Sequence, residues 1–432
     1  MLSDVHLNPF VGGAVDKEIL AAPVSRWPSL YSAGPKPVSN YGADATVPLF
    51  QSAVQDAASR VPAPDFILYP GDFLTHGLPD KVKAASGRTD AKTLHQVAVD
   101  TTKFLALELR HAFVGVPILP ALGNTDSACG DYQVEPGGSY LSDTWPMVQE
   151  LVGTDRLAED AEKTWRAGGY YRAAHPTVKN AQVVVLNNIL WSERFENQCG
   201  GGNVDTAGDA MLDWLGGVLG GAERRGEVTW LIYHIPPGIN AYNTAHAAPG
   251  ECRDDTAVYW RERYRKAFAA LMERHGARVL AAFSGHIHRD SFRLFTSSGG
   301  VEAATTIAPS ISPIFGNNPA YQVFRYDPKT GALSDKTTYF AENLSAAAAD
   351  EAPLAWRELY QFSQSYGGKY GKAELAGLAK TLETPDQSAG RTLYSRFYGA
   401  GHGEAPSGNW PVFGCAPGHI QESSFNDCRC AR

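Results

Sequence analysis

Histidine, aspartate and asparagine recur in five short segments, each of which follows a strand-like run. The segments are Ser3-Asp4-Val5-His6, Gly71-Asp72, Gly123-Asn124-Thr125-Asp126, Tyr233-His234 and Gly285-His286-Ile287-His288. Imidazole nitrogens combined with carboxylate and amide oxygens form ligand sets for zinc, iron(II) or manganese, and not for a calcium cage. Each segment alone is typical of an ordinary turn, so the indication of a metal site comes from all five together.

The segments contain seven candidate metal ligands, which are Asp4, His6, Asp72, Asn124, His234, His286 and His288. Seven ligands are too many for one tetrahedral ion. They suffice for two ions about 3.5–4 Å apart if one carboxylate bridges them, an arrangement that serves phosphoryl transfer. The pattern therefore predicts a dinuclear centre that hydrolyses phosphoesters.

The elements that must position these ligands alternate between short apolar runs and longer amphipathic stretches. Strands are predicted over 65–69, 116–119, 182–186, 228–233 and 279–283, and helices over 45–60, 90–113, 205–222 and 257–275. This alternation predicts an α/β layered fold. Ligand sites in open α/β sheets form beyond the carboxyl ends of the strands, where glycines let the backbone turn sharply.

The last part of the chain has a different character. Residues 290–340 favour a strand-rich meander with a turn at Asp327-Pro328-Lys329-Thr330-Gly331, and 346–400 favour helix with breaks, before a tail rich in glycine and proline. We therefore expect a catalytic domain over 1–345. A helical, cysteine-containing extension attached to it is expected over 346–432.

The composition excludes several classes of protein. The 432 residues include 38 Lys+Arg and 46 Asp+Glu, a formal charge of −8, which argues against a nucleic-acid polymer as the main partner. A small phosphoester substrate is compatible with this charge, because metal ions supply local positive charge. The sequence contains no apolar stretch long enough to span a membrane. We expect a monomer that acts on a small phosphoester.

Six cysteines indicate an extracytoplasmic protein. They are Cys129, Cys199, Cys252, Cys415, Cys428 and Cys430, without a Cys-x-x-Cys pair. Three disulfides in a secreted or periplasmic protein are favoured over buried free thiols, and Cys428 and Cys430 are expected to bond to distant partners rather than to each other. The start of the chain lacks a basic region and an apolar region, so a signal peptide is not expected within it.

The ordered set of segments resembles the blocks of the calcineurin-like metallophosphoesterase superfamily, over about residues 1–340. Those blocks are Asp-x-His, Gly-Asp, Gly-Asn-His-Asp/Glu, a lone His and Gly-His-x-His. The resemblance implies a four-layer sandwich of two mixed β-sheets flanked by helices. It also implies two ligand groups that share Asp72 as the bridge, one with Asp4, His6 and His288, the other with Asn124, His234 and His286.

A narrower resemblance links the chain to acid sphingomyelinase-like phosphodiesterases. It is carried by His76 in Gly71-Asp72-Phe73-Leu74-Thr75-His76, by residues 233–238, and by residues 309–313 with Asn317-Asn318-Pro319. The resemblance implies a phosphodiesterase for a small diester or nucleotide, with a metal-bridging hydroxide as nucleophile. Two divalent ions are implied, zinc first, with manganese or iron as alternatives. Catalytic roles are expected for His76, Asp72 and Asn124.

The chain departs from the family pattern at one position, where Thr125 replaces the His that follows the ligand Asn. In the family pattern this His contacts the phosphoryl group and helps to protonate the leaving oxygen. A threonine cannot act as a general acid near neutral pH, so either His76 acts alone or the leaving group needs little protonation. Asp126 is expected to orient its neighbours from outside the ligand set.

Candidate substrate contacts are His76, Thr125, Asn187 and His246. Two other functions stay open at this point. The same centre could serve a phosphomonoesterase or polyphosphatase, or the chain could be a metal-binding protein whose catalysis is weakened by Thr125.

Overall fold

The computed structural model describes residues 1–196, 204–247, 252–253, 255–297, 299–384, 388–403 and 409–431. Its strands are β1 (Ile67–Tyr69), β2 (Ile118–Pro120), β3 (Tyr171–Ala174), β4 (Ala181–Val185), β5 (Val228–Ile232), β6 (Val279–Ser284), β7 (Ser291–Ser297), β8 (Gly300–Ile307), β9 (Ala320–Tyr326), β10 (Leu333–Ala341) and β11 (Trp356–Gln361).

The α-helices are α1 (Ala14–Ala21), α2 (Trp27–Ala33), α3 (Val47–Arg60), α4 (Leu78–Ser86), α5 (Ala91–Ala112), α6 (Ser139–Val152), α7 (Ala161–Gly168), α8 (Val204–Arg225), α9 (Ala241–Ala245), α10 (Glu262–His275), α11 (Leu344–Ala348), α12 (Phe362–Tyr366), α13 (Lys372–Glu383), α14 (Ala389–Tyr398), α15 (Trp410–Cys415) and α16 (Glu422–Cys430). Short 3₁₀ turns are η1 (Val24–Arg26), η2 (Asn188–Trp191) and η3 (Gly276–Arg278). Among the described residues, no helix combines the length and apolarity needed to cross a membrane.

One mixed sheet contains six strands in the order β3-β4-β5-β6-β8-β7. The four inner strands β4, β5, β6 and β8 are parallel, whereas β3 and β7 are antiparallel at the edges. Parallel strands covered on both faces read as continuous apolar runs, which explains the run of valines in β4.

A second mixed sheet is assembled around the first residues of the chain. It contains the parallel pair β1-β2 and the antiparallel group β9-β10-β11. The extended start of the chain lies between the two groups: the Leu2 amide donates to the Leu68 carbonyl at 3.1 Å, and the Gln322 amide donates to the Met1 carbonyl at 3.1 Å. Residues 1–6 therefore reach the centre of the sheet, next to the end of β1.

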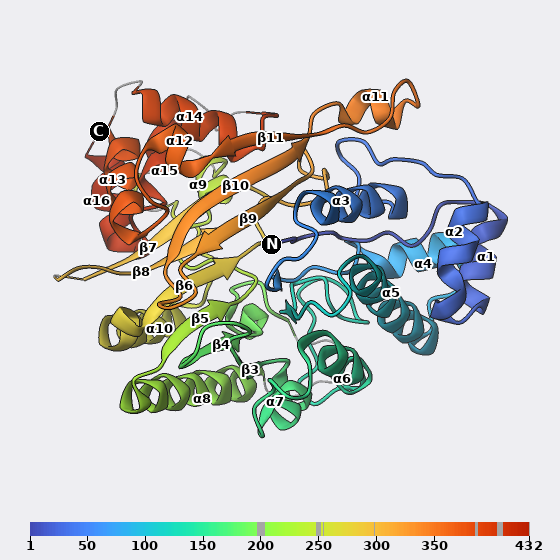
Figure 1. Ribbon diagram of the computed structural model, residues 1–432, viewed down its shortest axis with the longest axis horizontal. Coiled ribbons are helices and arrows are strands. Elements are labelled where there is room, and N and C mark those ends of the chain that lie inside the picture. Colours follow the sequence, from blue (N-terminus) through green and yellow to red (C-terminus); the bar gives the residue numbers. More distant parts are fainter. Residues whose placement is uncertain are drawn as a thin grey trace.

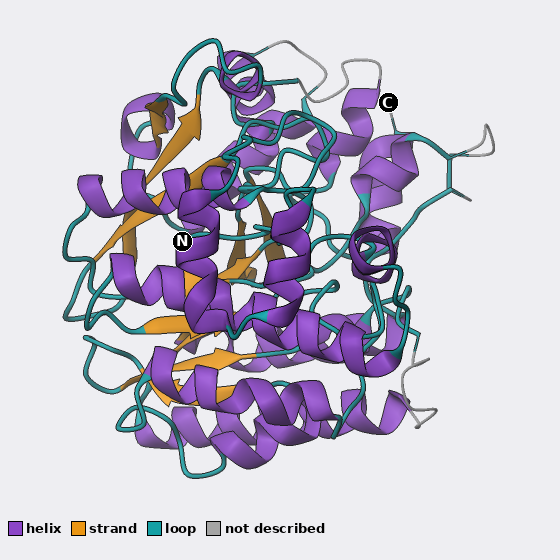
Figure 2. Ribbon diagram, turned by 90° about the vertical axis from the view of Figure 1, so that its right-hand side faces the viewer, coloured by secondary structure: helices purple, strands orange, loops and turns teal. Residues whose placement is uncertain are grey.

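The two sheets face each other across an aromatic layer. The Phe66 and Trp230 rings lie 5.6 Å apart between centroids, Trp230 and Tyr326 lie 5.4 Å apart, and Phe283 and Phe324 lie 5.3 Å apart. Helices α8 and α10 pack on the outer side of the six-stranded sheet, and α3 and α5 lie on the side of the second sheet (Figure 1). Figure 2 shows the strands enclosed by helices. The four-layer sandwich of two mixed sheets flanked by helices is confirmed.

Most of the predicted elements are present. The five predicted strands correspond to β1, β2, β4, β5 and β6, and the four predicted helices to α3, α5, α8 and α10. The predicted turn joins β9 to β10, where the Gly331 amide donates to the Asp327 carbonyl at 2.7 Å. The helical region that was expected, with breaks, over 346–400 also contains a strand that was not predicted, at Trp356–Gln361. This segment forms β11 because its backbone completes the edge of β10.

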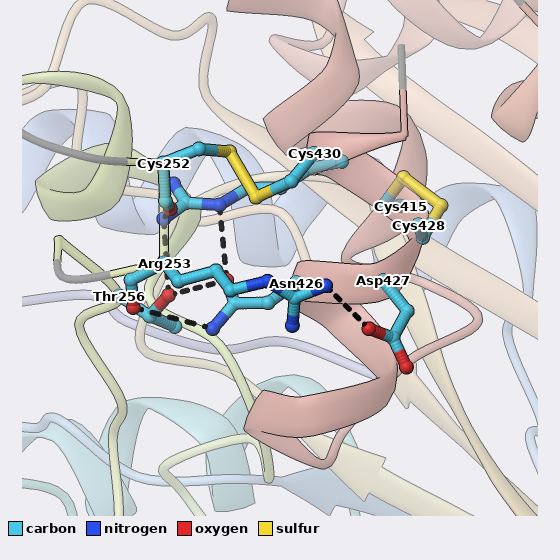
Figure 3. The surroundings of a disulfide bond; sticks show 9 residues. Cys252, Arg253, Thr256, Cys415, Asn426, Asp427, Cys428 and Cys430 are labelled. Carbon is cyan, nitrogen blue, oxygen red and sulfur yellow. Dashed lines mark hydrogen bonds and ion pairs between the residues drawn. A yellow bond between two sulfur atoms is a disulfide. The ribbon is translucent and has the colours of Figure 1, made fainter.

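The C-terminal helices gather at one end of the strands (Figure 1) and are held to the body by apolar packing and by the Cys252–Cys430 disulfide. Helix α13 packs on β7 and β8, and aromatic residues of α14 and α15 join the same cluster. Cys430 of α16 is bonded to Cys252, and Cys428 to Cys415 (Figure 3). As expected, Cys428 and Cys430 do not bond to each other, and the partner of Cys430 is distant in sequence, whereas the partner of Cys428 lies only 13 residues away. Cys129 is disulfide-bonded, and Cys199 lies outside the described residues.

Removing the Cys252–Cys430 bond is expected to destabilise the protein strongly. The bond joins residues 178 apart in sequence, whereas Cys415–Cys428 joins residues 13 apart. In the chain-entropy model, the Cys252→Ser/Cys430→Ser variant should lose about 5 kcal/mol of unfolding free energy, and Cys415→Ser/Cys428→Ser about 3 kcal/mol. Urea denaturation measures both losses. An equal or larger loss from the short-loop pair would contradict the prediction.

Candidate metal centre

The loops that carry the predicted ligands lie at the carboxyl ends of neighbouring strands. Asp72 follows β1, Asn124 follows β2, His234 follows β5, and His286 and His288 follow β6. Asp4 and His6 belong to the extended start of the chain, where the Asp4 amide donates to the Gly71 carbonyl and the His6 amide to the Asp72 carbonyl. Strand ends of both sheets therefore meet at one site.

The structure brings the seven predicted ligand side chains together in two groups. The ligand atoms of Asp4, His6, Asp72 and His288 lie within 4.8 Å of one another, as do those of Asp72, His234 and His286. Asn124 joins the second group, with its Oδ1 3.0 Å from His234 Nε2 and 2.7 Å from His286 Nδ1. These are the two groups expected from the sequence, and their role as metal ligands stays a prediction.

Asp72 belongs to both groups. Its Oδ2 lies 2.9 Å from His234 Nε2 and 3.2 Å from His6 Nε2. The side chain is buried, so one carboxylate oxygen faces an imidazole of each group without access to water. This is the geometry that a bridging ligand requires.

Backbone contacts determine which nitrogen of each central histidine faces the site. His6 Nδ1 lies 3.1 Å from the Leu74 carbonyl, and His234 Nδ1 lies 3.0 Å from the Pro70 carbonyl. Because a carbonyl oxygen only accepts, both Nδ1 atoms carry hydrogen, and in the neutral rings the lone pair is on Nε2. Each Nε2 faces another ring nitrogen or an oxygen, such as His288 Nε2 at 3.0 Å from His6 Nε2.

Lone pairs that converge in this way require positive charge between them. Ligand atoms bonded at about 2.1 Å to one cation lie about 3.0–3.4 Å apart. The distances between the converging atoms run from 2.7 Å (Asn124 Oδ1 to His286 Nδ1) to 3.5 Å (Asp4 Oδ1 to His288 Nε2). The donor set therefore fits divalent cations of the zinc, manganese or iron(II) type.

Protons and cations compete for this site. Burial disfavours the charged form of His6, but the charge of Asp72 outweighs it and raises the pKa of His6 to about 10. The pKa of His234 is raised by Asp72 in the same way, against its burial. Burial, reinforced by the neighbouring histidines, holds the pKa of His286 and His288 well below the ordinary value. Cation binding would replace the protons that Asp72 attracts.

The ligand loops adopt strained backbone conformations. Positive φ angles occur at nine non-glycine residues of the described chain, and five of them are candidate ligands: Asp4 (50°), His6 (46°), Asp72 (60°), His286 (74°) and His288 (57°). Each such angle costs an L-residue about 1–2 kcal/mol. Strain of this kind persists only where the surroundings enforce it, and it clusters at functional sites.

Two glycines leave room for the candidate ligands. A Cβ atom on Gly123 would overlap Oδ1 and the backbone nitrogen of Asp72, and a Cβ atom on Gly285 would overlap Oδ2 of Asp4. The absence of a side chain at these positions lets a second strand end approach the carboxylate closely.

Asp126 ties the loops after β1 and β2 together. Its Oδ1 accepts from the amides of Phe73 (2.7 Å) and Leu74 (3.1 Å), and its Oδ2 accepts from those of Asp72 (2.9 Å) and Gly123 (2.7 Å). Burial raises the pKa of Asp126 to about 7, with a further contribution from the Asp72 charge. Asp126 supports the site from outside the ligand set, in agreement with the expected orienting role.

Thr125 contacts the bridging carboxylate. Its backbone amide and its Oγ1 both donate to Asp72 Oδ1, each at 2.9 Å. Oδ1 is thereby fixed while Oδ2 faces the histidines. The hydroxyl at this position thus supports a candidate ligand, and a role in contacting substrate stays a prediction.

His76 lies against the first ligand group. Its ring stacks on His6 with centroids 3.9 Å apart, and its Nδ1 lies 2.9 Å from Asp44 Oδ1. Burial alone would raise the pKa of Asp44, but the hydrogen bond from His76 and the charge of Lys81 hold it well below the usual range. Asp44 was missed in the sequence because nothing in its local pattern distinguishes it from an ordinary loop residue.

The other two predicted substrate contacts have different surroundings. The buried Asn187 donates through Nδ2 to the Gly168 carbonyl at 3.0 Å. His246 is exposed and stacks on Tyr242 with centroids 4.3 Å apart. It is the neighbouring Asn188 that contacts the ligand loop, because its Oδ1 accepts from the His234 amide at 3.2 Å. The rim also includes Phe315, which is 52% exposed and packs edge-on against His288.

The chain is similar to several known proteins. The family described as calcineurin-like phosphoesterase matches residues 1–290. Human acid sphingomyelinase-like phosphodiesterase 3b is 27% identical over 383 residues, which cover 85% of this chain and 75% of that protein. Human cyclic GMP-AMP phosphodiesterase SMPDL3A is 23% identical over 421 residues, covering 92% and 82%.

Among solved structures, a dimetal phosphatase from Danio rerio matches 67% of this chain and 84% of its own, with 15% identity and a TM-score of 0.39.

Replacing Gly123 by alanine is expected to destroy the candidate centre, because the new Cβ would displace Asp72. Zinc affinity measured by competition with a chelator should fall more than about 10²-fold. Gly217→Ala is the matched control, since Gly217 is exposed in α8 and a Cβ there meets no other atom. The control should keep its zinc affinity and gain up to about 1 kcal/mol of stability. Wild-type zinc affinity in Gly123→Ala would contradict the prediction.

The Thr125 hydroxyl is expected to contribute to metal affinity through Asp72. Thr125→Val keeps the shape of the side chain and removes its donor to Asp72 Oδ1, whereas Thr125→Ser keeps the donor. Loss of a hydrogen bond to a ligating carboxylate typically costs about 10–100-fold in affinity. Zinc titration should therefore show weaker binding in Thr125→Val and near-normal binding in Thr125→Ser. Equal affinities would show that the hydroxyl has no such role.

Proposed function

Because the chain belongs to the calcineurin-like phosphoesterase family and is a phosphoric ester hydrolase, we propose that it is a dinuclear-metal phosphodiesterase whose centre is formed by the two ligand groups that share Asp72. The observation that carries the proposal is that seven buried or half-buried side chains converge in two groups, which share Asp72.

Each ligand group would hold one divalent cation. Asp4, His6, Asp72 and His288 would hold one, and Asp72, Asn124, His234 and His286 the other. When bound, the two ions would supply an activated water as nucleophile and neutralise charge on the phosphoryl oxygens. Zinc is the preferred ion for this mixture of imidazole and oxygen ligands, with manganese and iron(II) as alternatives.

The chain's own groups would orient the substrate and exclude water. The strained, buried loops keep Asp72 and the histidines in place before the substrate arrives, so little reorganisation is needed during the reaction. His76 stacks on His6 of the first ligand group. The side chain of His76 is 24% exposed. This exposure supports the proposal that His76 gives a proton to the leaving oxygen of a bound phosphoester.

Small diesters or nucleotides are the proposed substrate class. The name of each relative described above contains the word phosphodiesterase, and one name specifies cyclic GMP-AMP. Monoesters and polyphosphate would use the same centre, and a substrate panel separates these cases. We also propose that the protein works outside the cytoplasm, because disulfides such as Cys252–Cys430 persist in oxidising compartments.

Loss of metal or of the bridging carboxylate is expected to abolish hydrolysis of bis(p-nitrophenyl) phosphate. Metal content by mass spectrometry should be near two ions per chain. Asp72→Ala or chelation should reduce kcat/KM more than about 10²-fold, because the ions supply several kcal/mol of transition-state stabilisation. Glu223→Gln is a suitable control, since Glu223 pairs with His275 on α8 and α10. Two bound ions without hydrolysis of any diester, monoester or polyphosphate would refute the proposed function.

A further inference from the structure

A buried aspartate, Asp44, lies behind His76 in the loop that precedes α3. Its side chain has no exposed surface. It accepts five hydrogen bonds at 2.6–3.3 Å, which come from Thr75 Oγ1, the His76 amide, His76 Nδ1, Lys81 Nζ and Ser312 Oγ. A buried carboxylate with this many donors is ionised and held in one orientation.

The contact with Asp44 determines how the His76 ring is protonated and oriented. An ionised carboxylate can only accept, so His76 Nδ1 carries the hydrogen of the 2.9 Å bond. The backbone amide of His76 donates to the other oxygen of the same carboxylate at 2.9 Å, so ring and backbone are fixed together. Because Nδ1 is bonded to Asp44, Nε2 is the ring nitrogen that would exchange a proton with a substrate.

The His76 ring is also confined on its faces and edges. One face stacks on His6 at 3.9 Å, with 22° between the ring planes, and Phe315 packs edge-on at 5.5 Å. Rotation of the ring would break the bond to Asp44 and the stack on His6 together. Lys81 and Thr75 contact each other as well as Asp44, so the support behind the aspartate is itself fixed.

We propose that Asp44 is the positioning residue of the acid His76, and that this pair replaces the histidine that Thr125 does not provide. The proposal rests on the proposed function. As the bond from phosphorus to the leaving oxygen breaks, the proton on His76 Nε2 moves to that oxygen and the ring becomes neutral, while Nδ1–H stays on Asp44. His76 then takes a proton from water through its exposed part.

The test compares two diesters that differ in their need for an acid. Bis(p-nitrophenyl) phosphate has a good leaving group, and diphenyl phosphate a poor one. For Asp44→Asn, kcat on diphenyl phosphate should fall about 10²-fold, within the contribution of a general acid. The kcat of the same variant on bis(p-nitrophenyl) phosphate should fall less than about 5-fold, because this leaving group needs little protonation. The KM for each of the two substrates should change less than about 2-fold. His76→Gln should show the same selectivity, and the double variant should be no worse than His76→Gln alone.

Glu223→Gln is again the matched control, because it removes a carboxylate from a histidine on another part of the protein.

Metal content distinguishes the proposal from its main rival. His76 Nδ1 or Nε2 also lies within 4.8 Å of ligand atoms of His6 and His288, so His76 could instead be a metal ligand oriented by Asp44. Retention of both ions in Asp44→Asn and His76→Gln supports the proposal, and loss of an ion from either overturns it.

A measurement on the unmodified enzyme covers the case in which Asp44→Asn does not fold. Nitrogen-15 NMR of histidine-labelled protein should show hydrogen on Nδ1 of His76, and Lys81→Met should leave that assignment unchanged. Hydrogen on Nε2 with a bare Nδ1 in the neutral ring would overturn the proposal. If the wild-type protein binds metal but hydrolyses no phosphoester, the proposed function fails, while the NMR result still decides whether Asp44 positions His76.

Discussion

The carboxylate of Asp72 is the group on which the rest of the candidate centre depends. Its Oδ2 meets imidazoles from two distant segments, His234 after β5 and His6 at the start of the chain, and its Oδ1 is held by Thr125. All of these groups are buried, so the negative charge must be balanced locally, by protons on the histidines or by cations. The two ligand groups are therefore mechanically and electrostatically coupled through one side chain.

Keeping the loops in this state requires a rigid frame. Five candidate ligands have positive φ angles, and such strain is tolerated only because packed elements surround it. The frame comes from the two facing sheets with their aromatic layer, and from Asp126, which binds four amides of two loops. Glycines at 123 and 285 allow the strand ends to approach within contact distance of the carboxylates.

The C-terminal part of the chain contributes to the same frame. Asp290, two residues after His288, forms a buried ion pair with Lys336 of β10 at 2.6 Å and accepts from Tyr360 of β11 at 2.8 Å. Its amide donates to the Tyr398 carbonyl at the end of α14. A buried carboxylate with these partners fixes the direction in which β7 leaves the ligand loop. Residues beyond 346 thus help to orient the loop that holds His286 and His288.

The sequence by itself determined the fold class, most of the strands and helices, and the set of candidate metal ligands. This succeeded because apolar periodicity and short glycine-containing motifs are local signals. Only the tertiary structure decided that Asp44 holds His76, that Thr125 holds Asp72, and that Trp356–Gln361 forms a strand rather than a helix. Each of these depends on contacts between residues at least 15 positions apart. Hydrogen-bond partners at such distances are chosen by the packing of the two sheets, not by neighbouring residues.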